Sequence, residues 1–115
     1  MLTAIFLAHF LCASGDTQGN LRVSSLLSDH TLWSVPRAHQ GMITALAWSP
    51  DGHLLASGGQ DGQVLIWHAD TGHLCRSFCH GFQVEQIRWS PNHLLVSISG
   101  MLVRVWFVQP STPVC

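Results

Sequence analysis

A pattern of three short β-prone runs, complete at residues 39–67 and repeated about 40 positions later, most constrains the fold of this chain. In the first copy, small or apolar residues alternate up to Trp48, and Ser49-Pro50-Asp51-Gly52 then supplies turn chemistry. A second run, HLLAS, leads into the glycine-rich turn at 58–62, and a third run, QVLIW, closes the unit. Connections this short permit only antiparallel pairing, so we predict a β-meander.

The same offsets recur at residues 80–106. His80 precedes Trp89 by as many positions as His39 precedes Trp48, and HLLVS repeats HLLAS. The run HLCRSF, which begins at His73, supplies a fourth strand for the middle unit. A period near 40 residues with four strands per unit is typical of propeller blades. After the last copy the chain reads VQPSTPVC, where two prolines disfavour another strand.

The first segment, residues 1–38, is interpreted as a degenerate copy. MLTAIFLA aligns with MITALAWS and CASGDTQGNLRVS with LASGGQDGQVLIW, with a loop two residues shorter between them, and HTLWSV then forms the fourth strand. The apolar opening also fits a secretory signal peptide cleaved after Gly15. The lack of a basic residue near Met1 and the presence of His9 in the apolar run favour the repeat, although both interpretations stay open.

Four side chains stand where the meander of the middle unit would bring them together: His39, Ser57, Asp61 and Trp67. This pattern resembles the WD40 repeat. The resemblance implies a buried hydrogen-bond chain from the Trp indole to Ser, from Ser to His and from His to the turn Asp, so these residues are expected to be structural.

The other two copies retain less of this network. The 80–106 copy keeps the members His80, Ser97 and Trp106, but Gly100 falls near the position of the turn Asp. In the first copy Ser24 stands at the Trp position and Gln18 at the Asp position. Packing must therefore stabilise this first unit in place of the polar network.

The resemblance implies an all-β fold, an incomplete WD40-type β-propeller of about three blades of antiparallel four-stranded meanders. The expected units are a degenerate blade at 1–38, a well-formed blade at 39–79, and a blade at 80–115 that lacks the turn Asp and a clear fourth strand. Closed propellers typically have four to eight blades. We therefore expect a fragment or short isoform of a longer WD40 protein, or a chain that joins another chain to complete a ring.

Enzymatic chemistry is not expected. Asp61, His39 and Ser57 are the residue types of a hydrolytic triad, but the family geometry buries them between strands. The glycine-rich turn at 58–62 is followed by a strand and no lysine, which excludes a phosphate loop. No cofactor is implied.

Metal and nucleic-acid sites are also not expected. Cys75 and Cys79 lie roughly 13 Å apart on an extended strand, too far for one zinc ion shared with His73 and His80. The charged fraction is 10% and the net charge is −1, with five arginines and no lysine, which disfavours binding to nucleic acid or an anionic membrane. The repeat pattern demands no disulfide among the four cysteines, which favours a reducing compartment, cytoplasmic or nuclear.

The most consistent function is a non-catalytic protein–protein interaction scaffold. In the family, the usual docking face holds the loops before each first strand and between the second and third strands. On this chain those loops contain Gln40, Met42, Gln60, Phe82, Gln83 and Met101. Met42 and Phe82 could instead simply cover the central channel of the propeller or a blade seam. Alternative interpretations are a structural segment of a large multidomain enzyme or ribonucleoprotein component, and a small secreted protein with a signal peptide.

Overall fold

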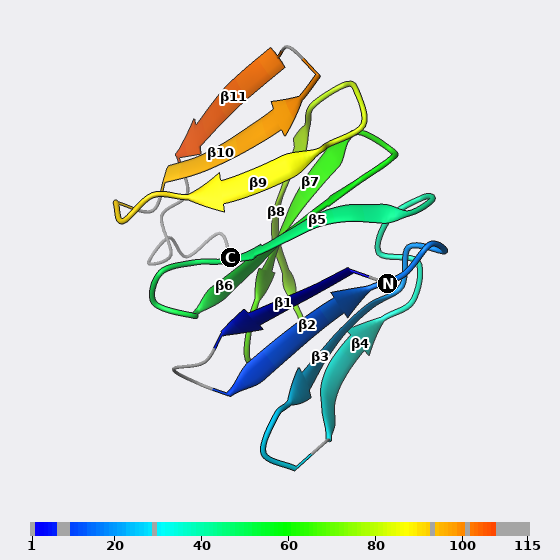
Figure 1. Ribbon diagram of the computed structural model, residues 1–115, viewed down its shortest axis with the longest axis vertical. Helices are drawn as coiled ribbons and strands as arrows, with labels where there is room; N and C mark the ends of the chain where they lie inside the picture. Colours follow the sequence, from blue (N-terminus) through cyan, green and yellow to red (C-terminus); the bar gives the residue numbers. More distant parts are fainter. Residues whose placement is uncertain (1, 7–9, 29, 93, 101, 108–115) are drawn as a thin grey trace.

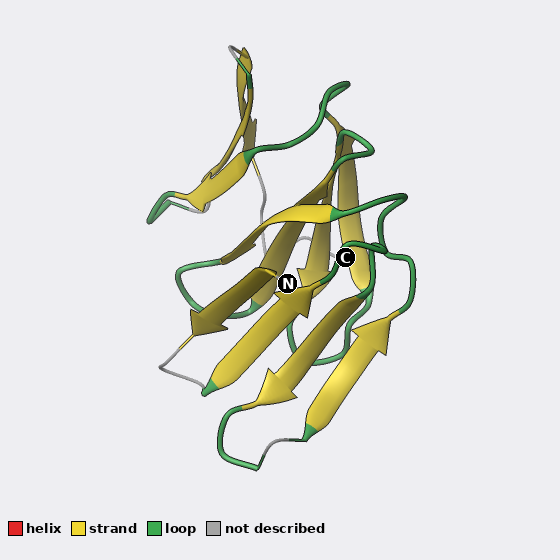
Figure 2. Ribbon diagram, turned by 45° about the vertical axis from the view of Figure 1, so that its right-hand side comes forward, coloured by secondary structure: helices red, strands yellow, loops and turns green. Residues whose placement is uncertain are grey.

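The computed structural model describes residues 2–6, 10–28, 30–92, 94–100 and 102–107, and within these ranges every regular element is a β-strand (Figure 1). None of the described segments is a helix that could cross a membrane. The strands form three separate antiparallel sheets, which Figure 2 shows as successive layers. The all-β, unclosed architecture agrees with the expected fold class.

We call the three sheets blades 1, 2 and 3. Blade 1 contains β1 (Leu2–Phe6), β2 (Leu11–Gly15), β3 (Leu21–Ser25) and β4 (Thr31–Val35) in that order. Blade 2 contains β5 (Ile43–Trp48), β6 (Leu54–Gly59), β7 (Gln63–His68) and β8 (Leu74–Cys79). Blade 3 contains β9 (Gln86–Trp89), β10 (Leu94–Ser99) and β11 (Leu102–Phe107), with no fourth strand among its described residues.

The strand register of blade 1 corrects one detail of the sequence alignment. Ala4 pairs with Ala13 as Ala47 pairs with Ala56, and both members of the first pair precede the second by 43 positions. Blade 1 therefore needs no shortened loop, and Ala4 stands at the place of Ala47 and not of Ala45. The likeness of MLTA to MITA misled the alignment. Because the error is two residues, each side chain stays on the expected face.

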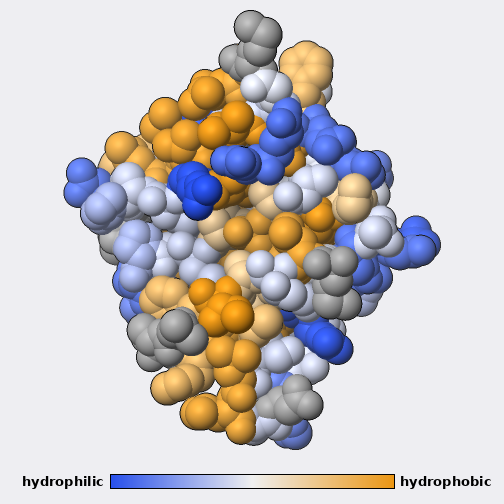
Figure 3. Space-filling model, viewed as in Figure 1, coloured by the Kyte–Doolittle hydropathy of each residue, from blue (hydrophilic) through white to orange (hydrophobic). Residues whose placement is uncertain are grey.

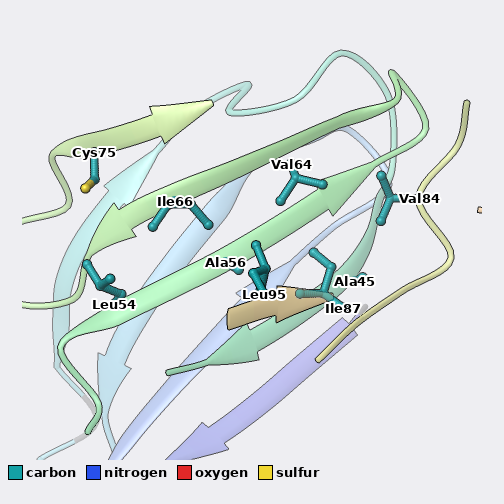
Figure 4. Close-up of a cluster of buried hydrophobic side chains, with 9 residues drawn as sticks. All are labelled: Ala45, Leu54, Ala56, Val64, Ile66, Cys75, Val84, Ile87 and Leu95. Carbon is teal, nitrogen blue, oxygen red and sulfur yellow. The ribbon is translucent and has the colours of Figure 1, made fainter. Parts of the chain in front are cut away.

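The apolar cores lie between blades and not within them. One cluster joins blades 1 and 2 through Ala13, Val23, Ile43 and Leu55 among others. The second joins blades 2 and 3, and Figure 4 shows its side chains converging from both sheets, including Ile66. A single sheet has two faces and no interior, so each blade is stabilised by what packs against it.

A tryptophan hydrogen bond recurs at both seams. The Trp48 indole N–H at the end of β5 donates to the Ala4 carbonyl, and the Trp89 indole N–H at the end of β9 donates to the Ala47 carbonyl, each at 3.0 Å. These bonds join equivalent positions, so each inner strand is tied to the inner strand of the preceding blade. Trp33 adds a bond from blade 1 to the Ala69 carbonyl at 2.7 Å.

A glycine in the second strand lets the next blade approach closely at each seam. A β-carbon at Gly15 would lie 2.6 Å from Ile43 Cγ2, and one at Gly58 would lie 2.6 Å from Val84 Cγ1. Contacts this short require a neighbour to move. The two glycines therefore create the hollows into which the β-branched residues of the following blade fit.

The seam geometry predicts the effect of filling one hollow. Gly58→Ala should lower the free energy of unfolding by about 1–3 kcal/mol, because the new methyl group overlaps Val84. In a Val84→Ala background the same substitution should cost less, since the nearest overlapping atom, Val84 Cγ1, is gone. Urea denaturation of the four variants measures this coupling, and additive penalties would contradict the packing described.

Candidate functional site

The four predicted network residues of blade 2 meet in the structure. The Trp67 indole N–H donates to Ser57 Oγ at 2.9 Å, and Ser57 Oγ lies 2.8 Å from His39 Nε2. His39 Nδ1 lies 3.1 Å from Asp61 Oδ1. His39 comes from the loop before β5, Ser57 from β6 and Asp61 from the β6–β7 turn, so the chain of bonds fastens this loop and turn to the sheet.

The bonding pattern assigns the protons in this network. The Asp61 carboxylate accepts, so His39 carries its proton on Nδ1, and Nε2 accepts from the Ser57 hydroxyl. The Ser57 oxygen is then free to accept from Trp67. Burial pushes the Asp61 pKa upward, but hydrogen bonds from the Gln40 and Gln63 amides and from His39 outweigh it, and the pKa lies below its ordinary value.

The equivalent residues of blade 3 meet in a different arrangement. The Trp106 indole N–H donates to Ser97 Oγ at 2.9 Å, as in blade 2. His80 Nε2, however, lies 3.3 Å from the Ser97 carbonyl oxygen, and its buried Nδ1 has no hydrogen-bond partner. A carbonyl only accepts, so the Nε2 of His80 carries the proton, which is the opposite tautomer to that of His39.

Blade 1 organises its β2–β3 turn by another residue. Asp16 accepts from the backbone amides of Gln18 and Asn20 and from the Asn20 side chain, each at 2.9 Å. The Asn20 side-chain bond is the main reason that the Asp16 pKa lies below its ordinary value. Gln18, which aligns with the turn Asp of blade 2, is exposed, and its backbone amide donates to Asp16. The Asx-type cap was not predicted, although the sequence Asp16 to Asn20 carries its signal.

The triad-like geometry of blade 2 leaves no route for a substrate. Ser57 and His39 are fully buried, and Ser57 Oγ is engaged by both Trp67 and His39. The arrangement can hold strands together, but its hydroxyl cannot reach an external carbonyl.

Metal-binding side chains do not cluster in the part of the chain that the structure describes. Cys12 and Cys79 carry free thiols. Cys75 is disulfide-bonded, which the repeat pattern did not lead us to expect.

Three of the six candidate contact residues line two neighbouring hollows. Met42 and Gln83 line one of about 390 Å³, and Phe82 and Gln83 line the other, of about 840 Å³; Glu85 borders both. Phe82 is 67% exposed, so its ring is available to a partner. Gln60 and Gln40 are also exposed, and Gln60 accepts from the Met42 amide at 3.1 Å. Met101 lies outside the described residues.

Sequence reasoning missed the role of Glu85. Its carboxylate accepts from the Gly100 amide and so caps the β10–β11 turn from the loop before β9. It is also the acidic group of both hollows. The only sequence signal was a lone carboxylate near the start of a predicted inner strand.

Known proteins resemble this chain in sequence. Residues 10–99 match the family model described as the anaphase-promoting complex subunit 4 WD40 domain. The chain is 33% identical over 82 residues to Protein FIZZY-RELATED 1 of Arabidopsis thaliana, covering 66% of this chain and 17% of that protein. It is 33% identical over 89 residues to the small ribosomal subunit protein RACK1 of Brassica napus, covering 76% of this chain and 27% of that protein.

A solved structure shows the same arrangement of strands. The crystal structure of RRP9 WD40 repeats superposes with a TM-score of 0.85 and 27% sequence identity, covering 92% of this chain and 34% of that chain. The chain thus spans 17%, 27% and 34% of these three proteins.

The two buried histidines provide a matched test of the network. His39→Leu should cost about 2 kcal/mol more unfolding free energy than His80→Leu, because it leaves Asp61 and Ser57 without their partner, whereas His80 makes one long bond. Chemical denaturation of both variants measures the difference. Equal penalties would mean that the network adds nothing beyond packing.

The lowered pKa of Asp61 predicts that its contribution to the free energy of unfolding decreases at acidic pH. A carboxyl with a folded-state pKa below its unfolded value stabilises fully above the unfolded pKa of about 3.9, and this contribution is lost as pH falls through the folded pKa. The stability advantage of the wild type over Asp61→Asn should therefore shrink on acidification below about pH 4. Thermal unfolding at a series of pH values measures it, and a constant difference would rule out this linkage.

Proposed function

The chain belongs to the WD40-repeat family, and from this premise we propose that it is a non-catalytic protein–protein interaction scaffold that docks partners on the loops around Phe82. The observation that carries the proposal is an exposed aromatic ring beside a hollow with an acidic rim. Large exposed aromatic side chains next to a concavity are frequent anchors of protein interfaces.

The chemistry of the hollows favours one kind of partner segment. Leu102 lines the hollow with Phe82, and Leu2 and Ile43 line the neighbouring one, so an apolar side chain would be sheltered in either. The Glu85 carboxylate stands between them and favours a basic or amide group next to that side chain. We propose that the partner presents an apolar residue adjacent to a lysine, arginine or glutamine.

The absence of catalysis is part of the same proposal. The buried state of Ser57 and the structural engagement of His39 and Asp61 support a network that holds loops in place. A rigid scaffold with displayed loops is the common use of such repeats. Assay of the purified chain with an ester substrate should give no turnover that depends on Ser57.

We also propose that the chain is a fragment or short isoform of a longer WD40 protein, or joins another chain that completes the propeller. Its coverage of only 17% and 27% of the two relatives supports this, as do its two open end blades. The strand β1 supplies the Ala4 carbonyl to the first seam, which supports assigning residues 2–6 to blade 1 rather than to a signal peptide.

A role within a ribonucleoprotein is the second candidate. It is favoured by the likeness to a protein named as a component of the small ribosomal subunit. In that setting the chain would contact neighbouring proteins, since its low positive charge gives little attraction for RNA. For either role we propose a cytoplasmic or nuclear location, in which the disulfide of Cys75 would be an uncommon feature.

Affinity capture tests the loop-face proposal. The tagged chain, its Phe82→Ser variant and a Leu27→Ser control are used to recover proteins from a cell lysate, followed by quantitative mass spectrometry. Leu27 is 76% exposed and lies in the β3–β4 connection, away from the Phe82 loop. Specific partners should fall about tenfold or more with Phe82→Ser and be retained by Leu27→Ser. Equal recovery by all three forms would refute docking at Phe82.

A further inference from the structure

Another hollow lies at the seam between blades 1 and 2, at the opposite end of the strands from the Phe82 loop. Its volume is about 420 Å³, and β2, β4 and the β5–β6 and β7–β8 turns supply its lining, which consists of Leu11, Leu32, Gly52, His53, Ala69 and Asp70. We call it the seam hollow. Both of its walls belong to blades that pack on each other within this chain, so it is not part of an end face.

A β-bulge places Leu32 at the seam hollow. The register of β3 and β4 shifts between Val23 and Ser24, and Leu32 is the extra residue of β4. Blade 2 has a bulge at the same place, where the extra residue is Cys75. Cys75 is buried in the cluster that joins blades 2 and 3, whereas Leu32 is 49% exposed. The first seam therefore leaves open a position that is covered in blade 2.

The start of β2 shows the same difference. Leu11 pairs with Ser25 as Leu54 pairs with His68, so the two leucines occupy equivalent positions. Leu54 is buried, whereas Leu11 is only half-buried. Its neighbour Phe10 is exposed, and Figure 3 shows hydrophobic side chains gathered over blade 1, in the lower part of the view. An apolar side chain from another molecule would gain burial against both leucines of the seam hollow.

One wall of the seam hollow is held firmly and has its backbone already bonded. The Ala69 amide donates to the His53 carbonyl at 2.9 Å, and the Ala69 carbonyl accepts from the Trp33 indole at 2.7 Å. The Gly72 backbone lies against the Trp33 ring, since a β-carbon there would be 2.6 Å from Trp33 Cδ2. Because Ala69 has no backbone group left to bond, the side chains of the hollow must recognise a ligand.

The polar side chains of the seam hollow are Asp70 and His53, and both residues are exposed. Neither the Asp70 carboxylate nor the His53 imidazole forms a hydrogen bond or ion pair with another residue that the structure describes. No lysine or arginine is among the lining residues. An unpaired carboxylate beside an apolar hollow attracts a cation, and the stems of lysine and arginine can cover apolar surface at the same time.

We propose that the seam hollow binds a segment of a second protein in which an aliphatic side chain stands next to a lysine or arginine. The aliphatic side chain lies against Leu11 and Leu32, and the cation faces Asp70. This site goes beyond the loop face around Phe82, because it lies at the other end of the strands and uses none of the same residues. The scaffold would then hold partner segments at both ends of its strands.

Capped dipeptides test both parts of the recognition. Three probes, acetyl-leucyl-lysine amide, acetyl-leucyl-glutamate amide and acetyl-glycyl-lysine amide, are titrated into the isotope-labelled full chain while its amide chemical shifts are followed by NMR. The leucine–lysine probe should shift the amides of Gly52, His53 and Asp70 with a dissociation constant on the order of 1 mM. The other two probes should bind at least about threefold more weakly, because each lacks one of the two recognised groups.

Two variants and a matched control assign the contacts. Asp70→Asn should abolish the preference for the leucine–lysine probe over the leucine–glutamate probe, and Leu32→Ser should weaken the binding of both at least about threefold. Leu74→Ser is the control, because Leu74 is 51% exposed on the outer strand of blade 2 and does not line the hollow. It should bind the probes as the wild type does. All three substitutions are at exposed sites, and thermal unfolding verifies that each variant is folded.

Three results would overturn the proposal. They are the absence of shifts at these amides up to about ten times the expected dissociation constant, equal binding of the lysine and glutamate probes to the wild type, and loss of binding with Leu74→Ser. Photo-crosslinking with a diazirine analogue of the leucine–lysine probe makes the same comparisons for the chain within any assembly that completes the ring. Phe82→Ser should leave probe binding unchanged, so failure of this site and failure of loop-face docking are separate outcomes.

Discussion

No blade in this chain can bury its own faces, and the remaining structure follows from that constraint. Each three- or four-stranded meander presents alternate side chains to two sides, so apolar burial requires a neighbour on each side. Blade 2 has two neighbours and contains the most completely buried strand, β6, all of whose residues are buried. Among the described residues blades 1 and 3 have one neighbour each, and apolar side chains on them are more exposed, with Ile5 at 56% and Val105 at 61%.

Polar bonds give these apolar seams a defined geometry. The indoles of Trp48 and Trp89 tie successive inner strands at equivalent carbonyls. Within blade 2, the bonds from Trp67 through Ser57 and His39 to Asp61 fasten the loop that carries Gln40. The loop that carries Gln40, one of the candidate contact residues, therefore stands on a rigid base, which lowers the entropy lost on binding.

The repeated sequence predicted the strands well because turn residues and alternation are local signals. It predicted the blade 2 network because all four side chains stand at element ends whose meeting is fixed by the meander. The opposite tautomer of His80 could not be predicted, because it depends on a carbonyl direction within β10. The roles of Asp16 and Glu85 escaped prediction since lone carboxylates have many uses, and the register of β1 was misjudged because a four-letter likeness outweighed turn length.

The seams connect only blades that are adjacent in the sequence, with β5 packed on β1 and β2, and β9 on β5 and β6. Interactions of this nearest-neighbour kind make the three blades a one-dimensional cooperative system, in which the stability of each blade depends on the blade beside it. Blade 2 is coupled on both sides, whereas either terminal blade can open by breaking a single seam. Local opening would thus involve blades 1 and 3 before blade 2, and the amide hydrogens of β6 would be among the last to exchange.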